Sequence, residues 1–231
     1  MNNTNSIQRL KPIALAVTYI FHPVFILFYI FLSLTFITPI DFIFSDKKQS
    51  IALYGMVAGM SIFFPLISIF AMRASGLLST IKLSESKERI GPLITTIIFY
   101  LWLFLNYRQF DLGPEIFEAN ILGALISLFL AFFINNFSKI SLHAVGIGGL
   151  LGAVILFRFA ISTSIYKIPF GDYELQLSPN IFLLIIVVIS GLVCTSRLFL
   201  RTHKPADVYG GCLVGFVSQL FAYKLIEIWS N

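Results

Sequence analysis

The sequence predicts an all-α bundle of six to seven membrane-spanning helices, and two observations support this prediction. The first is composition: 58% of the 231 residues are hydrophobic, 12% are charged, and the mean hydropathy is +0.90. A soluble domain usually contains about 25% charged residues, so lipid is the expected solvent around most of this chain. The second is that the apolar residues form long continuous runs. A lipid-exposed backbone must satisfy its own hydrogen bonds, so continuous runs favour helices over a barrel of short alternating strands.

Each predicted span is an apolar run long enough to cross a bilayer. A helix needs about 20 apolar residues to cross a hydrocarbon core about 30 Å thick. By this rule the candidate spans are 13–38, 51–72, 92–107, 116–137, 144–165, 180–201 and 207–229. The third is the shortest. No internal repeat is visible, and we expect one membrane domain over residues 1–231, multi-pass in the cell membrane, with the bacterial inner membrane favoured.

The net charge of +5 does not indicate a nucleic-acid partner, because no solvated basic domain exists to carry it. In a membrane protein, Lys and Arg more often mark loop ends or contacts with anionic lipids. Membrane lipids are therefore the expected partners, and the sequence does not fix the oligomeric state. Cys194 and Cys212 both fall in apolar runs, where core packing is expected of them in preference to a disulfide or a metal site.

Three polar clusters interrupt the apolar runs and are predicted to face the same side of the membrane. The first is "KLSESKERIGP" (82–92), the second is "SKISLHA" (138–144), and the third is "SRLFLRTHKPADVYGG" (196–211). Two expected spans separate each cluster from the next, and an even number of crossings returns the chain to the same side. Acidic residues occupy the opposite loops: Asp41, Asp46, Asp111, Glu115, Asp172 and Glu174.

The cations of these clusters are suited to holding a phosphate. Lys82, Arg89 and Arg197 offer charged donors, and Arg grips a phosphate through two parallel hydrogen bonds. Ser141 adds a neutral hydroxyl.

The two histidines are suited to act as the nucleophile and as the proton-transfer group. Pro205 fits the first turn of the last helix, where its missing N–H costs nothing, so His203 is expected just before a helix N-terminus that favours an anion. Asp207 lies four residues after His203, close enough to orient its imidazole and activate it as a nucleophile. His143 remains for proton transfer. Together these are the parts of a metal-free phosphoryl-transfer site.

At these residues the sequence resembles the type 2 phosphatidic acid phosphatase (PAP2) superfamily of integral membrane phosphatases. That family has three signatures, K-x6-R-P, P-S-G-H and S-R-x5-H-x3-D, and the third is the most specific. The matching residues are, in order, Lys82 and Arg89, then Ser141 and His143, then Ser196, Arg197, His203 and Asp207. The first two spans lie outside the resemblance.

The chain departs from these signatures at three positions. The proline of the first signature is displaced to Pro92, and Ile140 and Leu142 replace the proline and glycine of the second. Glycine allows a backbone to approach a phosphate closely, so Leu142 bears on substrate range more than on reaction type.

The resemblance implies a PAP2-like fold, no cofactor and no metal. It implies that His203 attacks phosphorus, that Asp207 fixes its tautomer, and that His143 protonates the leaving alcohol and then activates water. Lys82, Arg89, Ser141 and Arg197 would bind the phosphate oxygens. The implied substrate is a lipid phosphomonoester or diphosphate, such as phosphatidic acid, phosphatidylglycerol phosphate or a prenyl diphosphate.

Other interpretations stay open at this point. A non-catalytic lipid or solute carrier with a phosphate-binding polar cluster is the main rival, although carriers often show repeated halves and broken helices. A structural protein that keeps remnants of a site is a third possibility. His22, followed by Pro23 inside the first span, resembles a proton-relay position, but a kink with a hydrogen-bonded structural histidine is favoured.

Overall fold

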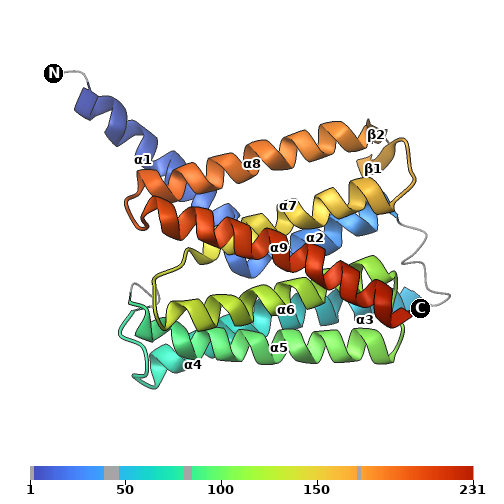
Figure 1. Cartoon of the computed structure of the whole chain (residues 1–231), viewed down its shortest axis with the longest axis horizontal. Helices are drawn as coiled ribbons and strands as arrows, with labels where there is room; N and C mark the ends of the chain where they lie inside the picture. Colours follow the sequence, from blue (N-terminus) through green and yellow to red (C-terminus); the bar gives the residue numbers. More distant parts are fainter. Residues whose placement is uncertain (1–2, 39–46, 81–84, 171–172, 231) are drawn as a thin grey trace.

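The computed structural model describes residues 3–38, 47–80, 85–170 and 173–230, and it shows a helical bundle (Figure 1). Six of the described helical segments are long and apolar enough to cross a membrane, judged by length and composition, or seven if the bent pair α1–α2 counts as one span. The predicted polytopic helical bundle is confirmed at this level. The elements, in chain order, are α1 (Asn3–Ile20), α2 (Pro23–Ile37), α3 (Lys47–Ala58), the π-helical turn η2 (Gly59–Phe63), α4 (Phe64–Ala74), the 3₁₀ turn η3 (Lys87–Arg89), α5 (Ile90–Gln109), α6 (Glu115–Asn135), α7 (Leu142–Ala160), β1 (Tyr166–Phe170), β2 (Tyr173–Leu177), α8 (Pro179–Phe199) and α9 (Pro205–Ser230).

The first expected span, 13–38, is not one straight helix. It breaks between Ile20 and Pro23, and the two parts are bent by 63°. The cause is Pro23, because a residue before proline is forced out of the helical region, and His22 is extended at φ −65° and ψ 139°. The predicted kink is therefore confirmed, and it is sharp enough to make α1 and α2 separate helices.

The helical bundle also contains one element that the sequence did not predict, a short hairpin. Strands β1 and β2 pair antiparallel, with Tyr166 opposite Leu177 at the open end of the hairpin. This hairpin occupies part of the stretch between the fifth and sixth spans, so α7 ends at Ala160 and not near residue 165. Paired strands satisfy their own backbone hydrogen bonds in a segment where no apolar helical run is available.

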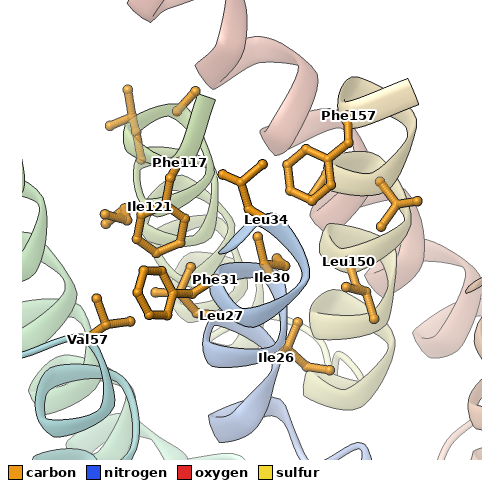
Figure 2. Close-up of a cluster of buried hydrophobic side chains, with 14 of the residues drawn as sticks. Ile26, Leu27, Ile30, Phe31, Leu34, Val57, Phe117, Ile121, Leu150 and Phe157 are labelled. Atoms are coloured by element: carbon orange, nitrogen blue, oxygen red, sulfur yellow. The ribbon is translucent and has the colours of Figure 1, made fainter. Parts of the chain in front are cut away.

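Helix α2 lies in the middle of the bundle and carries much of its core. Its buried side chains Ile26, Leu27, Ile30, Phe31 and Leu34 are at most 4% exposed. Figure 2 shows them between α6, which contributes Phe117 and Ile121, and α7, which contributes Leu150 and Phe157. Because α2 is enclosed on both sides, its N-terminus has a fixed place relative to α7.

Helices α7 and α9 are in direct backbone contact. They run in the same direction because α8 returns the chain between them (Figure 1). A Cβ atom added at Gly215 would collide with the carbonyl oxygen of Val145, and one added at Gly148 would collide with that of Cys212. Gly211 and Gly215, like Gly148 and Gly152, have the four-residue spacing that lets membrane helices approach closely.

Gly215→Ala should therefore force α7 and α9 apart and destabilise the bundle by about 1–3 kcal/mol, the range for overpacking a tight core. The measurement is the unfolding midpoint of the purified protein in detergent. Gly210→Ala is the matched control, because it lies on the same helix and a Cβ there meets no atom within 4 Å. An equal effect of both substitutions would contradict the backbone contact.

Candidate active site

A cavity of about 180 Å³ lies at the end of the bundle where α2, α5, α7 and α9 begin. The basic side chains on its wall are His22, Arg89, His143, Arg197 and His203. The rest of the wall is largely apolar and comes mainly from α2, α5, α6 and α7, with Ile69 from α4 and Gln219 from α9. The cavity thus joins a cationic, histidine-rich region to a hydrocarbon-like one.

The start of a helix is electropositive, and several starts meet at this cavity. His22 caps α2, Arg89 is the residue before α5, and His143 is the second residue of α7. His203 lies two residues before the start of α9. Backbone N–H groups and the helix dipole favour an anion at each of these ends. Two guanidinium groups, from Arg89 and Arg197, add positive charge to the same cavity.

Arg89 is nearly buried and is held by the chain segment that leads into α7. It is 8% exposed, and its Nη1 donates to the carbonyl oxygen of Ile140 at 3.0 Å. This bond joins the start of α5 to the residue before the Ser141 cap of α7. The first and second polar clusters are therefore in contact, which agrees with the prediction that they face the same side of the membrane.

Arg197 enters from the last turn of α8. Its Nε is buried and has no hydrogen-bond partner among the described residues. Leaving a buried donor of a charged group unpaired costs free energy. A ligand oxygen in the cavity would remove that cost, so Arg197 is prepared to bind an acceptor.

His203 and Asp207 lie together at the start of α9, as their spacing predicted. Nδ1 of His203 is 3.5 Å from Oδ2 of Asp207, an electrostatic contact slightly longer than a hydrogen bond. The same carboxylate oxygen accepts a hydrogen bond from the backbone N–H of Lys204 at 3.0 Å. Asp207 therefore caps its own helix while it faces the imidazole.

The surroundings of His203 keep its imidazole neutral. Burial lowers the pKa of His203 to about 4, and the positive charges of Arg197, Arg89 and Lys139 act in the same direction. The Asp207 carboxylate opposes them without cancelling the effect. At neutral pH the ring therefore keeps a free lone pair, as a nucleophile requires.

His143 lies on the same cavity wall as His203 but has different partners. Its Nε2 is 3.2 Å from the main-chain carbonyl oxygen of Thr18 in α1. Its ring is nearly perpendicular to that of His22, with 5.2 Å between the ring centroids. His143 is thus held by the first two helices, which lie outside the three sequence signatures.

Of the remaining two predicted phosphate ligands, the structure describes only Ser141. Ser141 is fully buried, and its Oγ accepts a hydrogen bond from the N–H of Ala144 as the cap of α7. Its own N–H donates to the carbonyl oxygen of Asp207 at 3.2 Å. Ser141 is not among the residues that line the cavity, and its hydrogen bonds in the structure join α7 to α9. Lys82 lies outside the described residues.

Sequence reasoning left His22 out of the site, although the structure places it on the cavity wall. Its Nδ1 accepts a long hydrogen bond of 3.4 Å from the N–H of Val24, as expected for a structural histidine at a kink. The signal was the His-Pro pair within an apolar run. What the sequence could not supply was the position of the kink beside α7.

The described part of the chain contains no group of three or more His, Cys, Asp or Glu side chains arranged to hold a metal ion. Compared with known protein families, curated proteins and solved structures, the chain has no match.

The lowered pKa of His203 predicts its titration. The imidazole should stay neutral as pH falls from 8 to 5 and gain its proton only near pH 4, because burial and the adjacent cations disfavour the charged form. NMR of protein with labelled histidine, assigned with His203→Gln, measures this. The same histidine in denaturant is the control and should titrate near its usual value of about 6.5. A folded-state midpoint near 6.5 would contradict the described environment.

Proposed function

We propose that this protein is a membrane lipid phosphatase that hydrolyses a phosphomonoester or diphosphate through a phosphohistidine intermediate. The proposal extends the resemblance to the PAP2 superfamily to fold and activity. The observation that carries it is the shared cavity: Arg89, His143, Arg197 and His203 come from three separate sequence clusters and line one space. A neutral imidazole, a second imidazole and two guanidinium groups are the groups that metal-free phosphoryl transfer requires.

In the first step of the proposed reaction, His203 attacks phosphorus. The contact between Nδ1 and Asp207 places the proton of the neutral ring on Nδ1 and leaves the lone pair on Nε2. As the Nε2–P bond forms, the bond from phosphorus to the leaving oxygen breaks. Protonated His143 gives its proton to that oxygen, which departs as an alcohol or, from a diphosphate, as a phosphate group.

In the second step, water releases the phosphate. Neutral His143 takes a proton from a water molecule as its oxygen attacks phosphorus, the P–N bond breaks, and His203 returns to its starting state. Arg89 and Arg197 hold the equatorial oxygens in both steps, where charge is spread in the transition state. Lys82 is proposed as a third such cation.

The apolar part of the wall supports a lipid substrate. Ile26, Leu27 and Ile30 of α2, Leu93 of α5 and Leu128 of α6 line the same cavity as the cations. A hydrocarbon chain attached to the bound phosphate would contact these side chains and not water. Each buried CH₂ contributes about 0.8 kcal/mol to the binding free energy. Phosphatidic acid, phosphatidylglycerol phosphate and prenyl diphosphates all combine these two parts. We place the enzyme in the cell membrane on the same grounds.

The direct test is release of inorganic phosphate by the purified protein in detergent from short-chain phosphatidic acid and from a prenyl diphosphate. We expect turnover by the natural protein and a loss on the order of 10³-fold or more in His203→Ala, because the nucleophile is removed. Arg73→Ala is a matched control, because Arg73 is an exposed cation in the last turn of α4 and is not on the cavity wall.

Two results would contradict the proposal. One is a folded natural protein that binds these lipids and releases no phosphate, as a carrier would. The other is a His203→Ala variant that keeps near-normal activity, which would show that a different group attacks phosphorus.

A further inference from the structure

We propose that the C-terminal end of α1, where the helix breaks, positions His143. The main-chain carbonyl of Thr18 accepts a hydrogen bond from Nε2–H of His143, so Nδ1 is the nitrogen that gives and takes protons in the reaction. The catalytic consequence rests on the proposed function, but the tautomer itself does not. Thr18 and the break after it lie outside the stretch from Lys82 to Asp207 that contains the three signatures.

The carbonyl of Thr18 is available to His143 because α1 ends at Ile20, before the helical partner of that carbonyl. In a continuous helix it would accept the N–H of the residue four positions later, which is His22. The last α1-type bond is instead that from the N–H of Phe21 to the carbonyl of Val17, at 3.0 Å. Because Pro23 forces His22 into an extended conformation, Thr18 becomes one of the unpaired carbonyls at a helix C-terminus.

A carbonyl oxygen only accepts, so the 3.2 Å contact requires a proton on Nε2 of His143. A neutral imidazole carries one N–H, and its Nδ1 then has the lone pair. In the protonated ring both nitrogens carry hydrogen, and only the Nδ1 proton is available for transfer. The bond to Thr18 persists through both steps, while Nδ1 gives a proton to the leaving oxygen and later takes one from water.

The environment of Thr18 suits this role. Thr18 is 7% exposed, and its hydroxyl is occupied by a bond to the carbonyl of Ala14 at 2.9 Å, so only the carbonyl faces His143. Within the described residues no carboxylate forms an ion pair with His143, in contrast to His203. The perpendicular ring of His22 packs beside His143 and limits its rotation.

The first experiment measures the tautomer by NMR of the full-length protein in detergent, with histidine labelled with ¹⁵N in the imidazole ring. His143 is assigned with His143→Gln. We expect the neutral ring to show a protonated Nε2 and an unprotonated Nδ1. The opposite tautomer would overturn the proposal whether or not the protein is a phosphatase.

The second experiment removes the break. Pro23→Ala restores an N–H at that position and lifts the restriction on His22, so the His22 N–H can bond to Thr18 in place of His143. We expect the two His143 nitrogens to shift toward a mixture of tautomers. With a lipid phosphate that the natural protein hydrolyses, kcat should fall roughly tenfold or more while KM stays within about twofold, because proton transfer is impaired and the cations are unchanged.

Pro12→Ala is the matched control, because Pro12 lies inside α1 in an exposed position away from the break. It should leave both the tautomer and the kinetics unchanged. Unaltered His143 signals and an unaltered kcat in Pro23→Ala would overturn the proposal. If the natural protein proved inactive, the proposed function would fail, and the ¹⁵N spectra would still decide how His143 is held.

Discussion

The backbone contact between α7 and α9 is the constraint on which the site depends. Gly148 and Gly215 allow the two helices to touch along their lengths, and the N–H of Ser141 bonds to the carbonyl of Asp207 where they begin. His143 starts one helix and His203 precedes the other. Their separation is therefore set by main-chain packing, which is far less adaptable than contact between side chains.

Electrostatics explains why this end of the bundle would bind an anion. Buried cations are costly unless they are paired, yet Arg197 has a buried Nε with no partner among the described residues. The starts of α2, α5, α7 and α9 add positive potential to the same place. An anion with several oxygens would supply the missing partners, most fully when its charge is spread, as in the proposed phosphoryl transfer. Burial and the same cations lower the pKa of His203 and keep its imidazole neutral, as the proposed nucleophile must be.

Much of this arrangement could be predicted from the sequence, because it follows from span counting. Arg89, His143 and His203 were expected on one side since an even number of helices separates them, and they line one cavity. The spacing of His203 and Asp207 set their contact in the same way. The hairpin of β1 and β2 was missed because its strands are short and contain no long apolar run.

Features that depend on contacts between distant segments were not predictable. Ser141 fits a signature by spacing, but its hydroxyl caps α7, and spacing cannot distinguish a capping serine from a ligand. The His22–Pro23 pair indicated a kink, yet nothing in the sequence placed that kink beside His143. The four-residue glycine spacing in α7 and α9 is present in the sequence and is typical of closely packed membrane helices.

The proposed mechanism requires a covalent bond between His203 and phosphorus, and rapid acid-free quenching after reaction with a ³²P-labelled lipid phosphate detects this bond. We expect label on the peptide that contains His203, stable in alkali and lost in acid, as is usual for a phosphoramidate. We expect no label in His203→Ala. Label on another residue, or turnover by the natural protein with no labelled intermediate under conditions that trap other phosphohistidines, would contradict it.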